Sequence, residues 1–201
     1  SALMNIDLSK YDSLVVGPGI GIECEDWQKS IDYLLGFEGL LILDADALNR
    51  ISESKIGPKF FLERESKTWI TPHSKEFERL FPKIKCENNV ELVLNAAKEF
   101  NISVLLKGAN SVVADNKKIW QLFGTDAQTA RAGLGDLLFG FVAGSSAIDL
   151  TFSRNIKTDF FAKYVLLHSF AASTCKKGSN AYAIGDELSK LVRNKKMRQI
   201  C

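Results

Sequence analysis

Four short apolar runs, each followed directly by a polar or glycine-rich cluster, constrain the fold of this chain more than any other feature. Stretches with helical spacing separate the runs, which are Ser13–Val16, Leu40–Leu43, Trp69–Ile70 and Val104–Leu106. Strands that alternate with helices form βαβ units, and such units build a mainly parallel sheet. The sequence therefore predicts an α/β fold with helices on both faces of that sheet.

The polar clusters predict where a ligand binds. They lie around Gly19, Asp44, His73 and Lys107, and each begins where a predicted strand stops. In parallel α/β sheets, ligands bind outside the carboxyl ends of the strands. We therefore expect these clusters to gather along one edge of the sheet in one composite site.

The second half of the chain predicts a hairpin and helices and no further parallel strands. Val112–Ala114 and Ile119–Phe123 flank the turn residues Asp115 and Asn116 and predict a hairpin at a sheet edge. Three helices are expected after it, over Gly133–Ile148, Asp159–Lys176 and Tyr182–Val192. A length of 201 residues fits one domain over residues 1–201.

The motif Gly133-Leu134-Gly135-Asp136 opens the first of these helices. Small residues there expose backbone N–H groups at a helix N-terminus, where a phosphate is favoured. Asp136 beside such an anion could act as a base that takes a proton from a substrate hydroxyl. The same pattern is also a common cap, so both interpretations stay open on this motif alone.

Five motifs in order resemble the NAD(P)H-hydrate dehydratase family, and the resemblance covers nearly the whole chain. They are Gly17-Pro18-Gly19-Ile20-Gly21, Leu43-Asp44-Ala45-Asp46-Ala47-Leu48-Asn49, Thr71-Pro72-His73 with Glu76-Phe77, Leu106-Lys107-Gly108-Ala109, and Gly133-Leu134-Gly135-Asp136. The resemblance implies a ribokinase-like three-layer fold. It also implies that ADP or ATP, with Mg²⁺, phosphorylates the C6 hydroxyl of hydrated NADH or NADPH before phosphate leaves.

The resemblance assigns a role to each site residue. Asp136 would be the base and would contact the substrate, and Gly133 and Gly135 would bind the anion. Gly19 and His73 would contact the hydrated cofactor, and Glu76 would lie near magnesium. The nucleotide-binding segment would comprise Lys107, Gly108, Ala109, Asn110 and Ser111.

Each assignment has a purely structural alternative. Without its motif, His73 would only satisfy a turn carbonyl, and Lys107 would be a surface charge. Asp44 and Asp46, two residues apart, would share one face of an extended segment and organise loops without touching substrate, with Asn49 starting a helix. Ser74 is the expected cap of a helix through Phe81.

The chain departs from the family in two places. Leu134 replaces a serine that family members usually carry, which would remove one hydrogen bond to phosphate, and Arg131 adds a charge that we expect to compensate. The family's first strand-helix-strand section is not found before Ser1. That gap predicts an unpaired sheet edge or apolar face, and hence a homo-oligomer, a tetramer by resemblance, or association with the missing section.

Composition narrows the possible functions. Lys and Arg number 26 against 24 Asp and Glu, a balance that argues against nucleic acid as a partner. The four scattered cysteines indicate neither a zinc site nor a disulfide framework, so we expect a cytoplasmic protein. The apolar stretch Leu137–Ile148 is too short for a membrane span, and none is expected.

The leading interpretation is an ADP- or ATP-dependent hydro-lyase that repairs hydrated NADH or NADPH, with a fused or separate NAD(P)H-hydrate epimerase as a possible partner. One alternative is a ribokinase-like kinase for a vitamin precursor, which would release a phosphorylated product. Another is a nucleotide-binding module with little catalysis, which Leu134 and the missing front section would suit.

Overall fold

The computed structural model describes residues 6–21, 27–123, 133–153, 155–176 and 178–193. The chain divides into two compact units, residues 1–121 and residues 122–201. Each unit is described by itself. The prediction of one domain over residues 1–201 stays a prediction.

The first unit is built on a six-stranded sheet in which the strands follow their order along the chain, β1-β2-β3-β4-β5-β6. The strands are β1 (Ser13–Val16), β2 (Leu40–Leu43), β3 (Thr68–Ile70), β4 (Ser103–Leu106), β5 (Ser111–Ala114) and β6 (Ile119–Leu122). The pairs from β1 to β4 are parallel, and β4 pairs with β5 in antiparallel register. The predicted mainly parallel sheet with a hairpin at its edge is confirmed.

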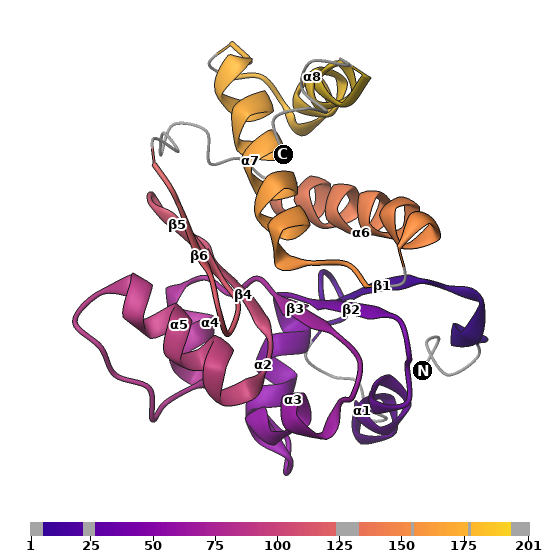
Figure 1. Ribbon diagram of the computed structural model, residues 1–201, viewed down its shortest axis with the longest axis vertical. Helices are drawn as coiled ribbons and strands as arrows, with labels where there is room; N and C mark the ends of the chain where they lie inside the picture. Colours follow the sequence, from indigo (N-terminus) through magenta and orange to yellow (C-terminus); the bar gives the residue numbers. More distant parts are fainter. Residues whose placement is uncertain (1–5, 22–26, 124–132, 154, 177, 194–201) are drawn as a thin grey trace. The chain divides into compact units, whose positions relative to one another are not determined.

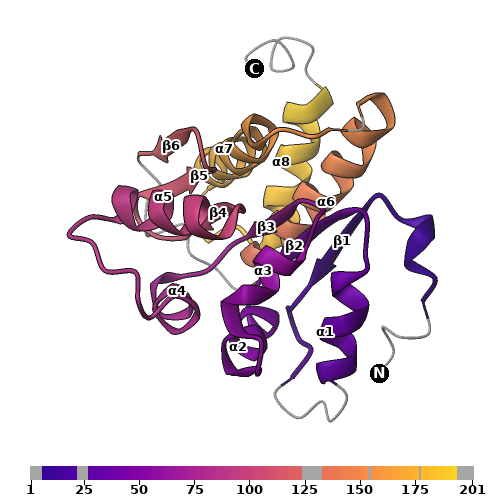
Figure 2. The ribbon, with the colours of Figure 1, turned by 60° about the horizontal axis from the view of Figure 1, so that its bottom comes forward.

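Five helices lie on one side of the parallel strands (Figure 1 and Figure 2). They are α1 (Trp27–Leu35), α2 (Asp46–Glu53), α3 (Phe60–Glu63), α4 (Ser74–Leu80) and α5 (Asn89–Phe100), and short 3₁₀ turns η2 (Leu8–Lys10) and η3 (Gly57–Lys59) accompany them. Each parallel strand is added next to the previous one in the order of the sequence, and crossover connections are right-handed. All the crossover helices therefore lie on the same face of the sheet.

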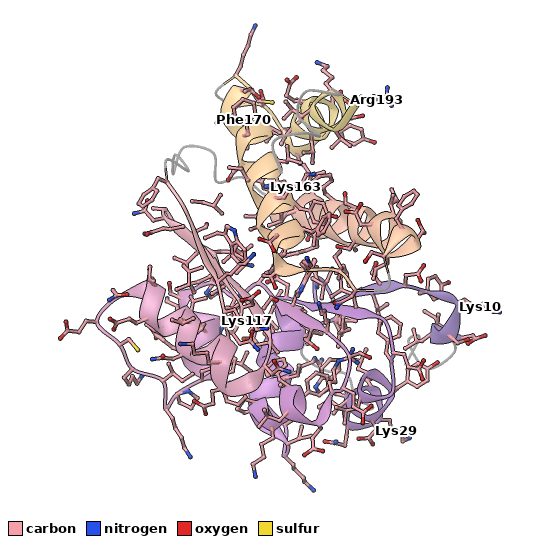
Figure 3. All side chains as sticks on the ribbon, in the orientation of Figure 1. Lys10, Lys29, Lys117, Lys163, Phe170 and Arg193 are labelled. Atoms are coloured by element: carbon pink, nitrogen blue, oxygen red, sulfur yellow. The ribbon has the colours of Figure 1, made fainter. Side chains whose placement is uncertain are left out.

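The core of the first unit lies between that sheet face and the helices. Leu41, Leu43, Ile70 and Val104 contribute from the strands. Aromatic rings fill the α4 and α5 end, where the Phe81 and Phe100 rings stack with centroids 4.8 Å apart. Charged side chains such as those of Lys10 and Lys29 lie at the periphery (Figure 3).

The buried guanidinium of Arg64 ties the end of α1 to the start of β3. It donates to the backbone oxygens of Phe37 at 2.8 Å and Gly39 at 3.0 Å, and to Thr68 Oγ1 at 2.9 Å. Burial lowers the pKa of Arg64 to about 10, so the group remains charged at neutral pH. The buried cation thereby holds the segment after α1 against the start of β3.

The second unit contains three helices, α6 (Leu134–Phe152), α7 (Thr158–Thr174) and α8 (Ala181–Arg193). Leu167, Ala171 and Ala172 of α7 pack with Ile184 and Leu188 of α8 in a small core. The three predicted helices are thus confirmed. The first continues past Ile148 to Phe152, because none of the residues 149–152 is a glycine or proline that would break the helix.

Helix α6 is the one helix among the described residues that is long and apolar enough to cross a membrane by length and composition. It has 19 residues, and 22% of its most apolar stretch is buried. Core helices of soluble proteins pass the same test, and this one carries Asp136 and Asp149. The absence of a membrane span therefore stays a prediction.

Candidate functional site

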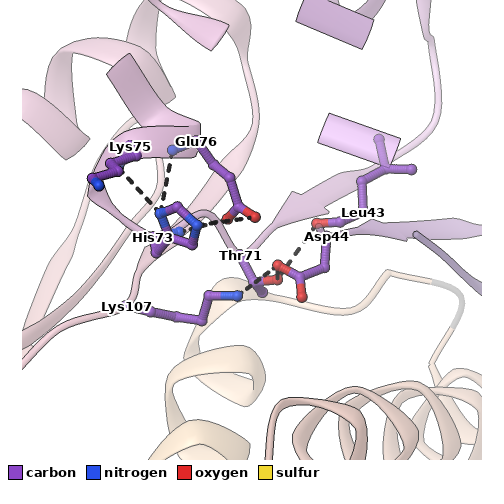
Figure 4. Close-up of polar contacts among 7 residues, drawn as sticks. All are labelled: Leu43, Asp44, Thr71, His73, Lys75, Glu76 and Lys107. Atoms are coloured by element: carbon purple, nitrogen blue, oxygen red, sulfur yellow. Dashed lines mark hydrogen bonds and ion pairs between the residues drawn. The ribbon is translucent and has the colours of Figure 1, made fainter. Parts of the chain in front are cut away.

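Three side chains converge where β2, β3 and β4 end. Lys107 Nζ lies 2.7 Å from Asp44 Oδ1, and the Thr71 hydroxyl donates to the same oxygen at 2.9 Å (Figure 4). Asp44 directly follows β2, Thr71 follows β3 and Lys107 follows β4. We call Asp44, Thr71 and Lys107 the strand-end cluster. The expected convergence of the polar clusters is found for these strands.

The carboxylate of the strand-end cluster is more buried than its cation. Asp44 is 4% exposed, whereas the side chain of Lys107 is 29% exposed. Burial raises the pKa of the Asp44 carboxyl, against the lowering effects of the Lys107 ammonium and the Thr71 hydroxyl. The ammonium thus remains within reach of solvent while its counter-ion lies inside.

His73 and Glu76 form the N-terminal cap of α4, beside the strand-end cluster (Figure 4). His73 Nδ1 accepts hydrogen bonds from the backbone N–H groups of Lys75 at 3.1 Å and Glu76 at 3.3 Å. The backbone N–H of His73 in turn donates to Glu76 Oε2 at 2.8 Å. The expectation that Ser74 is the cap is wrong, because the imidazole takes the place of a hydroxyl as acceptor. Among the residues that the structure describes, the ring does not bind a turn carbonyl either.

Glu76 is fully engaged in that cap. Its Oε2 accepts the His73 N–H, its Oε1 lies 3.3 Å from His73 Nε2, and the residue is 6% exposed. Within the described ranges, no group of three or more His, Cys, Asp or Glu residues could hold a metal. The described residues thus offer no all-protein metal cage, and the role of Glu76 near magnesium stays a prediction.

The segment Gly17–Gly21, here called the glycine loop, follows β1 and passes against the backbone of Asp44. A Cβ atom added to Gly17 would lie 1.7 Å from the Asp44 carbonyl oxygen, and Gly17 has φ +142°. Only glycine permits this approach and this dihedral angle. Nothing lies within 4 Å of a Cβ added to Gly19, so the tip of the loop faces open space.

Asp46 and Arg50 of α2 bind the far end of the glycine loop. The Gly21 N–H donates to Asp46 Oδ2 at 3.0 Å, and Arg50 Nε donates to the Gly21 carbonyl at 2.8 Å. Asp44 and Asp46 therefore do not share one extended face, as the alternation of a strand would predict. Ala45 between them has φ 47° and ψ −121°, which turns the chain so that the two carboxylates serve different segments.

Asn49 lies inside α2 and does not start a helix, contrary to expectation. Helix α2 already begins at Asp46, because the turn at Ala45 leaves the strand direction immediately after Asp44. Arg50, a site residue that sequence reasoning missed, stands four residues after Asp46 on the same helix face. That spacing would have been a usable signal if the helix had been predicted to begin at Asp46.

The nucleotide-binding segment predicted after β4 is an exposed turn. Gly108, Ala109 and Asn110 are exposed, and the Ser111 hydroxyl donates to the Gly108 carbonyl at 3.1 Å. Lys107 continues the parallel pairing of β4, because its N–H donates to the Pro72 carbonyl at 2.9 Å. The lysine is thus fixed at its backbone as well as at its ammonium.

The N-terminus of α6, in the second unit, has no side-chain cap. Gly133 is the cap residue with φ 79°, and Gly135 and Asp136 follow in the first turn, both exposed. The first N–H groups of the helix are consequently not taken by a capping side chain and suit an anion. Arg131, predicted to compensate for Leu134, lies outside the described residues.

A buried histidine lies beside that helix start. His168 of α7 is 6% exposed, and burial lowers its pKa to about 4, against a smaller raising effect of a hydrogen bond with the Leu134 backbone. Its Nε2 has no hydrogen-bond partner among the described residues. The imidazole is therefore neutral at physiological pH.

The fold places the chain in a structural class. A ribokinase-like superfamily protein from Enterococcus faecalis superposes with a TM-score of 0.75 at 20% identity, over 91% of this chain and 63% of the other. The Bacillus subtilis ADP/ATP-dependent NAD(P)H-hydrate dehydratase, crystallised with ATP and Mg²⁺, superposes with a TM-score of 0.67 at 22% identity, over 89% of this chain and 63% of the other. The chain has a ribokinase-like fold.

The sequence matches a particular family within that class. The family model described as NAD(P)H-hydrate dehydratase matches residues 1–194. The bifunctional NAD(P)H-hydrate repair enzyme of Synechocystis is 37% identical over 145 residues, which cover 72% of this chain and 27% of that enzyme. The chain belongs to the NAD(P)H-hydrate dehydratase family, and it spans about a quarter to a third of the length of such bifunctional relatives.

Proposed function

We propose that this protein uses ADP or ATP to dehydrate hydrated NADH or NADPH, restoring the reduced cofactor. Family membership and the uncapped N-terminus of α6 with Asp136 in its first turn support the proposal. The bound nucleotide would supply the phosphoryl group that turns the C6 hydroxyl into a leaving group. This chain would supply binding, a base and an anion site.

The roles follow from the chemistry of each segment. Asp136 is exposed and ionisable, and as a base it would take the proton of the substrate hydroxyl. The backbone N–H groups at Gly133 and Gly135 would stabilise the negative charge that develops on phosphoryl transfer. Leu134 offers no hydroxyl for this purpose, so backbone donors would carry the stabilisation.

The first unit would supply the remaining contacts. Lys107 and the segment through Ser111 would bind the nucleotide, because Lys107 presents a half-buried ammonium at a strand end. Gly19 and His73 would contact the hydrated cofactor at the same edge. Magnesium would be carried by the nucleotide phosphates with Glu76 near it, because Mg²⁺ is usually bound through substrate phosphates and one or two carboxylates.

The direct test is recovery of absorbance at 340 nm from hydrated NADH with the protein, magnesium and ADP or ATP. We expect recovery with the wild type and its loss in Asp136→Asn, which keeps the size of the side chain. Asp159→Asn is the matched control, because Asp159 also lies in the first turn of a helix, α7, and has no assigned role. Unchanged turnover in Asp136→Asn would refute the assignment of the base.

The same assay separates the alternatives. Accumulation of a stable phosphorylated product would indicate a small-molecule kinase. Nucleotide binding without any turnover would indicate a binding module. We also propose a cytoplasmic homo-oligomer that does not bind nucleic acid or membranes and that works with a fused or separate epimerase; that the relatives are bifunctional repair enzymes supports a second activity. Size-exclusion chromatography with light scattering tests the oligomeric state.

A further inference from the structure

We propose that Asp46 and Arg50 are positioning residues that clamp the glycine loop and thereby set the affinity for the hydrated cofactor. The inference rests on the proposed function, in which Gly19 of that loop contacts the cofactor. Asp46 and Arg50 bind the backbone of Gly21 and not the tip of the loop at Gly19. Their effect on the substrate is therefore indirect.

The clamp holds both backbone polar groups of one residue. Asp46 Oδ2 accepts the Gly21 N–H at 3.0 Å, and Arg50 donates to the Gly21 carbonyl through Nε at 2.8 Å and also through Nη2. Hydrogen bonds to charged groups are about twice as strong as those between neutral groups. Two opposite charges from one helix thus fix the position of a single glycine.

Burial of Gly21 does not explain these contacts. Gly21 is exposed, so water could satisfy its N–H and carbonyl groups without help from the protein. Arg50, by contrast, is 8% exposed and lies over the Trp27 ring, with the guanidinium carbon 5.4 Å from the ring centroid. A guanidinium that burial and stacking hold in place, and that is directed at an exposed carbonyl, orders the loop.

The other end of the glycine loop is fixed by packing. Gly17 lies against the Asp44 carbonyl, and the Asp44 N–H donates to the Val16 carbonyl at 3.1 Å. The Ile20 N–H donates to the Gly17 carbonyl at 3.3 Å and closes a turn. A loop held at Gly17 and at Gly21 presents its exposed tip, Gly19 and Ile20, in one conformation, which lowers the entropy lost on binding.

The division of labour between Asp44 and Asp46 makes the proposal specific. Asp44 holds Lys107, which belongs to the predicted nucleotide segment, whereas Asp46 holds the glycine loop. Loss of the clamp should therefore weaken binding of the hydrated cofactor and leave nucleotide binding unchanged. A general loss of structural integrity would weaken both.

The test compares Asp46→Ala, Asp46→Asn and Arg50→Met with the wild type. We expect Kd and KM for hydrated NADH to rise about tenfold in Asp46→Ala and Arg50→Met, the size of effect that one 1.4 kcal/mol interaction produces. Asp46→Asn retains an oxygen acceptor and should restore part of the affinity. Nucleotide KM and kcat should stay within about twofold.

Glu53→Gln is the matched control, because it removes one negative charge from an exposed position of the same helix. It should behave as the wild type in every measurement. Hydrogen exchange of the Gly21 amide, followed by NMR, gives a readout that needs no turnover. We expect faster exchange in Asp46→Ala and the wild-type rate in Glu53→Gln.

Two results would refute the proposal that Asp46 and Arg50 clamp the glycine loop. One is an unchanged Gly21 exchange rate in Asp46→Ala; the other is a parallel rise of the KM values for hydrated NADH and nucleotide. Failure of the proposed function has a different signature, namely no recovery of absorbance by the wild type. In that case the exchange rates and the Kd for hydrated NADH, measured without nucleotide, still decide whether the clamp acts.

Discussion

Gly17→Ala should destabilise the protein more than any other glycine-to-alanine change in the glycine loop. The new methyl group would lie 1.7 Å from the Asp44 carbonyl oxygen and 2.7 Å from the carbonyl carbon, and both atoms belong to the backbone. No side-chain rotation can relieve such a contact. Either β1 and the start of α2 must separate or Gly17 must leave its φ of +142°.

The expected cost follows from these two features. A non-glycine residue at a disfavoured positive φ costs about 1–3 kcal/mol. Displacing Asp44 also breaks the hydrogen bond from its N–H to the Val16 carbonyl, worth about 1 kcal/mol. The lower entropy of the unfolded alanine chain offsets about 0.4–1 kcal/mol. We expect a net loss of about 2–3 kcal/mol, or about 5–10 °C in Tm for a chain of this length.

Urea and thermal unfolding, followed by circular dichroism, measure this loss. Gly57→Ala is the matched control, since Gly57 also has a positive φ, +55°, but nothing lies within 4 Å of its added Cβ. It should lose about 1 kcal/mol. Equal losses in Gly17→Ala and Gly57→Ala would refute the close approach of the glycine loop to Asp44.

Three further predictions concern buried charged or titratable groups. Burial lowers the pKa of His168 from 6.5 to about 4, so between these pH values the unfolded chain binds a proton that the folded protein does not. The free energy of unfolding should therefore fall by about 3 kcal/mol as the pH drops from 6.5 to 4. Unfolding of wild type and His168→Phe across this pH range measures it, and the variant should lack that loss. Arg64→Met leaves buried carbonyls without donors and should cost about 3 kcal/mol in urea unfolding, whereas the exposed Arg79→Met should change stability by less than about 0.5 kcal/mol. Lys107→Met strands the buried Asp44 carboxylate and should cost about 2–4 kcal/mol at pH 7, most of which the double variant with Asp44→Asn should recover.

Each of these expectations has a contrary result. Equal pH slopes for wild type and His168→Phe would mean that His168 titrates normally in the folded protein. Equal losses in the two arginine variants would mean that the carbonyls near Arg64 find water. Additive losses in Lys107→Met and Asp44→Asn would mean that the ion pair contributes no coupling energy.

Local sequence determined the class of the fold. Apolar runs such as Leu40–Leu43 are buried along their whole length, and the alternation with helices requires parallel strands. The positions of polar residues directly after the strands also predicted that Asp44 and Lys107 would approach each other. Parallel strands end at one edge, so residues that follow them are neighbours whatever their separation in sequence, which here is 63 residues.

Tertiary structure alone decided what each polar side chain does. A backbone turn at Ala45 directs Asp44 to Lys107 and Asp46 to Gly21, although the two aspartates are only two positions apart in the sequence. The imidazole of His73, and not the hydroxyl of Ser74, caps α4. Side-chain direction depends on dihedral angles and on partners distant along the chain, and neither is encoded in the spacing of residue types.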